Sequence, residues 1–194
     1  MTVLVDLIQS NQSAQAVSEH LAALSVSDRV DQVRSLSRKA VGDLYQLMAG
    51  QRPMTLEDFV PSSLPTDARV PHLGINTLPV FRCFEKHFTR AVGRDGELWG
   101  YNKQQNQWIT GPGYFVVHPA SEGEELFIDY RSIPDGDIPD WPGRKVNEAG
   151  LSKLVYAGMQ DDMRVVCDGV SVGKARKGDK DLGQYFALVR GEAY

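Results

Sequence analysis

The stretch MRVVCDGVSVGK, residues 163 to 174, decides the fold that the sequence predicts. Runs of β-branched residues flank Asp168-Gly169, and an Asp-Gly pair readily takes the positive φ angles of a two-residue hairpin turn. The stretch therefore predicts two antiparallel strands. It does not predict a phosphate-binding loop, because its glycines are one residue too close together and Ala175 stands where that loop needs Ser or Thr.

Similar strands lie outward from this hairpin. The segments ELWGYN (97–102) and QWITGPGYFVVHP (107–119) can pair with each other, and EELFIDYRS (124–132) follows as a third strand. On the other side of the hairpin, QYFALVR (184–190) closes the sheet. Consecutive strands joined by hairpins pair antiparallel, so the sequence predicts an antiparallel sheet that can curl into a barrel.

The motif Gly111-Pro112-Gly113 predicts a corner between two strands. Proline at the second position and glycine at the third are typical of a type II turn, in which Gly113 takes a left-handed conformation. Pro112 has no N–H and a strand follows it, so the motif is a poor phosphate cradle, although the corner can border a pocket. In that strand Phe115 and Val117 share one face, and the sequence leaves open whether this face lies inside.

Residues 13 to 50 predict two helices. Ser13 caps a short helix, and Ser27 caps a longer one that Gly50 and Pro53 end. The short connection between them makes the pair an antiparallel helical hairpin. Its apolar stripe can pack on the rest of the protein, or it can form a homodimer or partner surface.

Residues 51 to 76 are expected to be a linker. Four prolines within them argue against a long helix and against a central strand. Thr55 and Asp58 can cap one short helical turn in this segment.

Residues 77 to 91 fit two patterns. Phe81, Phe84 and Phe88 recur at helical spacing behind Thr77 as a cap, which favours a helix and is the interpretation that we prefer. The alternation of Phe84, Lys86 and Phe88 favours a strand instead and stays open.

These segments add up to the α+β class. We expect an N-terminal helical hairpin (1–50), a Pro-rich linker (51–76) and an antiparallel, barrel-like sheet domain (77–194), together forming one cooperative unit. One or two further helices are expected in the last segment, one of them beginning at Asn147.

Composition excludes several classes of protein. The chain has 194 residues and a net charge of −4, which argues against broad binding of nucleic acid. It has no segment long enough to span a membrane and no signal peptide, so we expect a cytoplasmic protein. Cys83 and Cys167 match no zinc or CxxC spacing and are expected to be buried free thiols. No metal or cofactor is predicted.

The concentration of aromatic residues near the first hairpin indicates a binding function. Trp99, Tyr101, Trp108 and Tyr114 can line a pocket for a small, partly aromatic or apolar molecule, and they can equally fill a core. Because the chain carries no complete catalytic pattern, we favour a non-catalytic protein that binds such a molecule in a sheet-lined pocket.

Two alternatives remain. The first is an acid–base enzyme that uses His118 or His87 together with Glu85 and a tyrosine. The second is an interaction protein that acts through the helical hairpin of residues 13 to 50.

Overall fold

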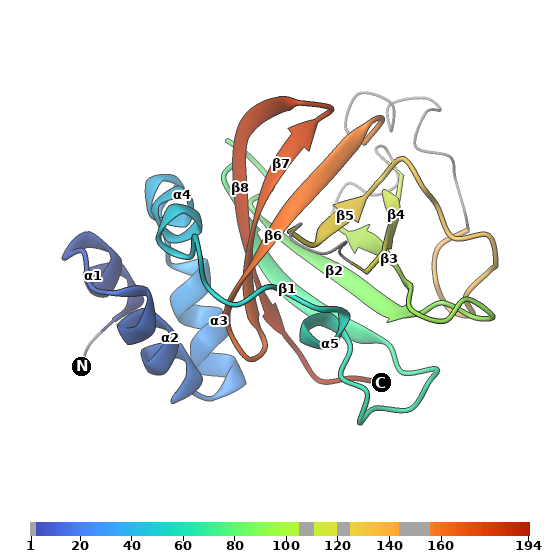
Figure 1. Ribbon diagram of the computed structural model, residues 1–194, viewed down its shortest axis with the longest axis horizontal. Coiled ribbons are helices and arrows are strands. Elements are labelled where there is room, and N and C mark those ends of the chain that lie inside the picture. Colours follow the sequence, from blue (N-terminus) through green and yellow to red (C-terminus); the bar gives the residue numbers. More distant parts are fainter. Residues whose placement is uncertain (1–2, 105–110, 120–124, 144–155) are drawn as a thin grey trace.

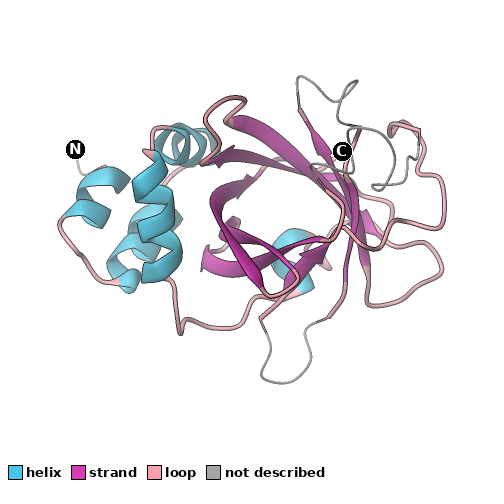
Figure 2. Ribbon diagram, turned by 90° about the horizontal axis from the view of Figure 1, so that it is seen from above, coloured by secondary structure: helices cyan, strands magenta, loops and turns pink. Residues whose placement is uncertain are grey.

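Eight antiparallel strands close into a barrel in the computed structural model, which describes residues 3–104, 111–119, 125–143 and 156–194. Each strand pairs with the next along the chain, and the eighth pairs with the first, so the predicted α+β fold with a barrel-like antiparallel sheet is confirmed (Figures 1 and 2). The strands are β1 (Val70–Asn76), β2 (Cys83–Arg90), β3 (Leu98–Lys103), β4 (Tyr114–Val117), β5 (Phe127–Asp129), β6 (Met159–Cys167), β7 (Val170–Lys177) and β8 (Lys180–Arg190).

The two predicted turns are present. β6 and β7 form the expected hairpin, and Gly169 in its turn has a φ of 75°, whereas Asp168 does not take the positive φ that was expected of it. Gly113 precedes β4 with a φ of 55°, so the predicted left-handed conformation is confirmed there. The face of β4 that carries Phe115 and Val117 packs in the barrel interior.

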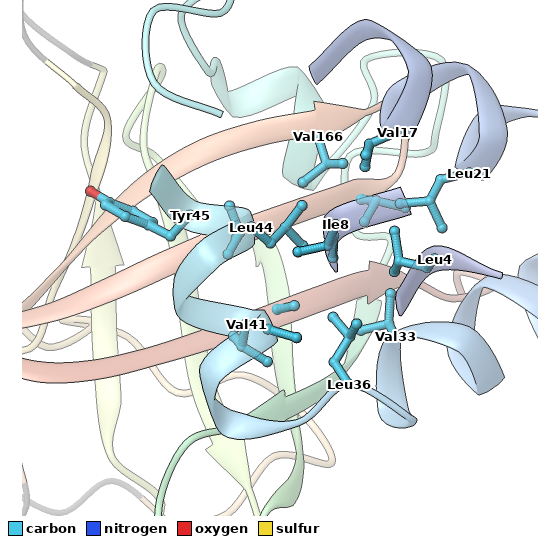
Figure 3. Close-up of a cluster of buried hydrophobic side chains, with 14 of the residues drawn as sticks. Leu4, Ile8, Val17, Leu21, Val33, Leu36, Val41, Leu44, Tyr45 and Val166 are labelled. Carbon is cyan, nitrogen blue, oxygen red and sulfur yellow. The ribbon is translucent and has the colours of Figure 1, made fainter. Parts of the chain in front are cut away.

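Four short helices form a layer on one side of the barrel (Figure 1). They are α1 (Leu4–Gln9), α2 (Ala14–Ala22), α3 (Val26–Arg34) and α4 (Arg38–Leu47). Their apolar side chains, Leu21 and Leu44 among them, pack on Val166 of β6 and on the outward residues of β7 and β8 (Figure 3). The helices thus cover one outer face of the barrel, and none of the described helices is long and apolar enough to cross a membrane.

The expected pair of helices is wrong in its count. The longer predicted helix is divided after Arg34, and Ser37 caps α4 by accepting a hydrogen bond from the Ala40 N–H at 3.1 Å. A serine hydroxyl offers the backbone a partner outside the helix, which is why serine favours a helix start over a helix interior. The cap of α3 is Ser25 and not Ser27, while the cap at Ser13 is confirmed.

The preferred helix over residues 77 to 91 is also wrong. This segment contains β2, in which Phe84 and Phe88 face the barrel interior. A spacing of four residues keeps side chains on one face of a helix and also on one face of a strand, so the phenylalanines alone do not decide. Pairing with β1 and β3 on both sides decides for the strand. Cys83 begins β2 and is exposed, so its expected burial is wrong as well.

The prolines of residues 51 to 76 do not exclude a strand, because β1 occupies the end of this segment. Pro71 lies near the start of β1, where its carbonyl accepts a hydrogen bond from the Gly191 N–H at 2.8 Å. A proline lacks only the donor, so it is tolerated near the start of a strand. The predicted helix at Asn147 begins outside the described residues.

The helix α5 (Leu56–Phe59) closes one end of the barrel, and it is seen through the ring of strands in Figure 2. It begins with the predicted capping box of Thr55 and Asp58. The ring of Phe59 stacks on the ring of Phe88 at 4.4 Å between centroids. The backbone carbonyl of Phe59 shares a hydrogen bond with the side chain of His72 on β1. The barrel therefore has one end closed by α5 and an opposite end that is available for a site.

Three glycines shape the barrel interior. Gly74, Gly100 and Gly173 stand directly opposite Phe84, Phe115 and Phe186 on the neighbouring strands. A Cβ at Gly100 would lie 2.1 Å from the Phe115 ring, and one at Gly173 would lie 2.2 Å from the Phe186 ring. Each of these glycines thus leaves room for the phenylalanine ring of the neighbouring strand, because a Cβ there would collide with that ring.

Candidate functional site

A cavity of about 460 Å³ opens at the barrel end opposite α5. Strands β1, β3 and β7 end there, and β2, β6 and β8 begin there. This volume is within the range of pockets that hold small molecules. The wall is mostly apolar or aromatic, and a few polar groups complete it; the lining includes Leu78, Phe84, Lys86, Asn102, Tyr130, Tyr156, Met159, Asp161, Lys177, Leu182 and Phe186.

A buried ion pair lies in the cavity wall. Lys86 Nζ of β2 lies 3.1 Å from Asp161 Oδ2 of β6, and each side chain is only 3% exposed. Nζ also donates a hydrogen bond to Asn102 Oδ1 at 2.9 Å and another to the hydroxyl of Tyr130. These three acceptors match the three N–H groups of a lysine ammonium, so the buried charge is fully hydrogen-bonded.

The partners of Lys86 are themselves connected. Tyr130 donates its hydroxyl proton to Asp161 Oδ2 at 3.1 Å. The amide nitrogen of Asn102 donates to the Tyr130 hydroxyl and to the Gly113 carbonyl, each at 3.1 Å. The backbone of the predicted corner at Gly113 is thus hydrogen-bonded to Asn102, which lines the cavity.

Aromatic rings surround the ammonium group. The ring centroids of Phe84, Phe115, Tyr130 and Phe186 lie 5.0 to 5.6 Å from Lys86 Nζ. A cation at this distance from aromatic rings is attracted by their π electrons. The three phenylalanines are those that stand opposite glycines on the neighbouring strands. The close packing of these rings against the glycine backbone therefore also places them around the ammonium group.

The pKa values of Lys86 and Tyr130 are shifted in opposite directions. Burial lowers the pKa of Lys86 below its usual value, and the carboxylate of Asp161 partly opposes this. Burial, together with the negative charge of Asp161, raises the pKa of Tyr130 well above its usual value. Tyr130 therefore keeps its proton and acts as a donor to Asp161.

One acceptor of the network is unused. Asp161 Oδ2 receives the hydrogen bonds from Lys86 and Tyr130, whereas no group in the described part of the chain donates to Oδ1. Asp161 lines the cavity, so a bound molecule can supply the missing donor. Lys177 contributes an exposed cation at the cavity edge.

The aromatic residues predicted from the sequence lie elsewhere. Trp99, Tyr101 and Tyr114 are on the outer face of β3 and β4, where they are buried beneath the segment that contains Trp141 and Ile138. They fill small outer cores and do not line the cavity. Trp108 lies outside the described residues.

The predicted acid–base residues are partly brought together. His87 Nε2 lies 2.8 Å from Glu85 Oε2, and His87 Nδ1 lies 3.1 Å from the hydroxyl of Tyr194. Glu85 and His87 are on the outer face of β2, and neither they nor Tyr194 line the cavity. His118 lies near the other end of the sheet, 3.3 Å from Glu97, so the structure does not bring it to Glu85.

Sequence reasoning missed the network of Lys86, Asn102, Tyr130 and Asp161. A signal for two of its members was present, because Lys86 alternates with Phe84 and Phe88, and Asp161 alternates with buried Met163. A charged residue at an inward strand position needs a partner of opposite charge, and a strand interpretation of residues 83 to 90 would have raised that question.

The described residues thus form an eight-stranded antiparallel barrel with an internal cavity and a buried Lys–Asp pair in its wall. Compared with known proteins, the chain matches no family model, and neither a curated protein nor a solved structure matches it. The described residues contain no group of three His, Cys, Asp or Glu side chains that could hold a metal ion. The function is therefore argued from the cavity itself.

Proposed function

We propose that this protein binds a small, largely apolar or aromatic molecule in the barrel cavity, without catalysis. The observation that carries this proposal is the cavity of about 460 Å³, whose wall combines aromatic rings with the buried polar network of Lys86, Asn102, Tyr130 and Asp161. Pockets of this kind bind apolar molecules by burial and use a few polar groups to orient them.

The chemistry of the network indicates the polar end of the ligand. The N–H groups of Lys86 are occupied by protein acceptors, so the ammonium has no further donor to offer. Asp161 Oδ1 offers an acceptor instead. The ligand that fits best carries one hydroxyl or N–H donor at its inner end, and a carboxylate there would face the carboxylate of Asp161.

The stacked pair of Tyr130 and Tyr156 indicates the body of the ligand. Their ring centroids are 5.5 Å apart with an interplanar angle of 16°, and both rings line the cavity with Phe84 and Phe186. Planar aromatic surfaces favour a flat apolar partner, because offset stacking and edge contacts add to the energy of burial.

The experiment is isothermal titration calorimetry, in which the protein is titrated separately with 2-naphthylmethanol, with its methyl ether and with 2-naphthoate. We expect saturable binding of the alcohol and roughly tenfold weaker binding of the ether, because a hydrogen bond to a charged acceptor contributes about 1.5–3 kcal/mol. We expect the naphthoate to bind weakest. Failure of all three probes to bind at their solubility limits would contradict the proposal.

Two variants place the same added ring inside and outside the cavity. Ala175→Phe fills the cavity from β7 and should abolish binding of the alcohol. Lys180→Phe adds a phenyl group at an exposed position of β8 and should leave binding unchanged. Equal binding by both variants would show that the probe lies elsewhere.

A second candidate is the acid–base alternative, and the contact of Glu85 with His87 favours it. Burial lowers the pKa of His87, and its hydrogen bond to Glu85 partly opposes this. A neutral His87 that donates from Nε2 to Glu85 presents Nδ1 as a base to Tyr194, whose side chain reaches solvent. The hydroxyl of Tyr194 would then be the reacting group.

This second candidate is tested by hydrolysis of 4-nitrophenyl acetate. The wild-type protein should release nitrophenol faster than buffer does, and Tyr194→Phe and His87→Gln should both lose the excess rate. Tyr185→Phe, a tyrosine in the layer between α4 and β8, is the matched control. A rate that Tyr194→Phe leaves unchanged would remove this candidate.

We also propose that the protein acts in the cytoplasm. Cys83 is an exposed free thiol and Cys167 a partly buried one. Exposed free thiols persist in a reducing compartment, which supports this location.

A further inference from the structure

We infer that Lys86 can form an imine with a carbonyl group, so that the cavity holds aldehydes or ketones covalently and reversibly. This inference rests on the proposed binding of a small apolar molecule in the cavity. It adds the chemical class of one set of ligands and the atom to which they attach.

The position of Lys86 is the first support. Its side chain lines the cavity, yet it is only 2% exposed, so a carbonyl compound reaches the amine only by entering the cavity. The apolar surroundings favour the neutral amine, which is the nucleophilic form of lysine. Exposed lysines lack this environment.

The position of Asp161 is the second support. A protonated imine retains one positive charge on the nitrogen, and the carboxylate 3.1 Å away already balances that charge. The rings of Phe84, Phe115 and Phe186 lie 5.0 to 5.6 Å from Nζ and stabilise a cation there. The site that holds the ammonium is therefore also suited to the iminium product.

The step balances without a further reactant. The ammonium of Lys86 passes one proton to Asp161, and the amine attacks the carbonyl carbon, forming a C–N bond as the C=O π bond breaks. The resulting carbinolamine oxygen takes up the proton from Asp161 and a proton from the nitrogen, and it leaves as water. One proton remains on the imine nitrogen, so the charge of the pair is the same before and after the reaction.

The network supplies the proton path for these transfers. Lys86 Nζ and the Tyr130 hydroxyl both hydrogen-bond to Asp161 Oδ2, so the proton passes directly between Lys86 and Asp161, while Tyr130 keeps its own proton and its hydrogen bond to the same oxygen.

The test uses 2-naphthaldehyde with sodium cyanoborohydride, which reduces an iminium ion to a stable amine. Intact protein at pH 7 should gain the mass of one naphthylmethyl group, and peptide mapping should place it on Lys86. We expect Lys86 to be modified about tenfold or more ahead of any exposed lysine, because an ordinary lysine with a pKa of about 10.4 is almost fully protonated at pH 7. Excess 2-naphthylmethanol should protect Lys86 by occupying the cavity.

Variants separate this inference from the proposed function. Lys86→Met should lose the adduct, and Lys177→Met, which removes the exposed lysine at the cavity edge, should keep it. If Lys86→Met does not fold, protection of wild-type Lys86 by the alcohol remains decisive.

Three results are informative. A protected adduct on Lys86 supports the inference. Binding of the alcohol with no adduct on Lys86 overturns the inference and leaves the proposed function intact. If excess alcohol does not prevent formation of the adduct on Lys86, the cavity is not the place where the aldehyde binds. The absence of alcohol binding also overturns the cavity as the binding site.

Discussion

His72 shows at the scale of one residue how the closed end of the barrel depends on protonation. Its side chain is 1% exposed, lies between Phe59 and Phe88, and shares a hydrogen bond of 3.0 Å with the Phe59 carbonyl through Nε2. A carbonyl only accepts, so Nε2 carries a proton and donates it to this hydrogen bond. Burial, with Arg190 and His87 nearby, lowers its pKa from 6.5 to about 3.

This shift predicts a loss of stability in mild acid. Below pH 6.5 the unfolded chain takes up a proton at His72 and the folded protein does not, so the free energy of unfolding falls by about 1.4 kcal/mol per pH unit. The contribution of His72 to the free energy of unfolding is fully present above pH 6.5. It has fallen by about 2 kcal/mol at pH 5, and it continues to fall to about pH 3. Urea unfolding at pH 8, 6.5 and 5 measures this.

The matched variant is His72→Gln, whose amide nitrogen can donate to the same carbonyl but does not titrate. It should flatten the profile between pH 6.5 and 5, leaving the smaller slope from His87, whose pKa is also lowered. An unchanged slope in His72→Gln would assign the acid sensitivity to other groups.

At this scale the sequence predicts helix caps and turns better than it predicts the site. Ser13, Gly113 and Gly169 act locally, and their expected roles are confirmed. Lys86 and Asp161 are 75 residues apart, and only the closure of the barrel brings them together. No local pattern contains that information, and the aromatic residues of one hairpin offer the clearest local signal in the sequence instead.

At the scale of elements, the pairs of glycine and phenylalanine on adjacent strands set the width of the barrel interior. Gly100 and Phe115 are the closest of these pairs, and a Cβ at Gly100 would also lie 2.6 Å from the His87 carbonyl. A backbone atom cannot move aside as a flexible side chain can, so added volume must displace the strands.

Gly100→Ala should therefore destabilise the protein by about 1–3 kcal/mol, the usual cost of overpacking. Gly143→Ala is the control, because no atom lies within 4 Å of its added Cβ, and it should change stability by less than about 0.5 kcal/mol. Thermal unfolding of both variants measures the difference. Equal melting temperatures would mean that Phe115 leaves the wall at little cost.

The error over β2 belongs to this scale too. Phe84 and Phe88 fit a helix and a strand equally, and the sequence offers Thr77 as a helix cap. Strand pairing with β1 was the missing information, because the prolines of residues 51 to 76 argue against a central strand there. Because β1 was not predicted, the strand that pairs with β2 was missing from the interpretation of residues 77 to 91.

At the scale of the whole molecule, the helix layer and the barrel share one apolar core. Leu44 is fully buried against this core, together with Val166 and Val172 of the barrel exterior. The apolar stripe that could have formed a homodimer surface is therefore used within the chain.

We expect the helices and the barrel to unfold together. Leu44→Ala should lower the free energy of unfolding by about 2–5 kcal/mol, whereas Lys39→Ala, at a position that is 85% exposed, should lower it by less than about 1 kcal/mol. Far-ultraviolet circular dichroism and tryptophan fluorescence should give coincident transitions in both variants. Loss of the helical signal before the fluorescence change would show that the layer is an independent unit.

The sequence predicts this overall organisation well, because strand-forming segments with hairpin turns and an amphipathic helical segment define the class. The closure of the sheet depends on β1, which was not predicted, and on its pairing with β8.

Two of the glycine–phenylalanine pairs, Gly74 with Phe84 and Gly173 with Phe186, also make the cavity adjustable, because both phenylalanine rings line it. Each pair occupies one register position on two neighbouring strands, at a different point on the barrel circumference. Exchanging one of these two pairs for alanine and leucine would alter the wall at one place, because the three atoms nearest to the added Cβ all belong to side chains. A small set of such variants would have cavities of different shapes, and each cavity would select molecules of a different shape.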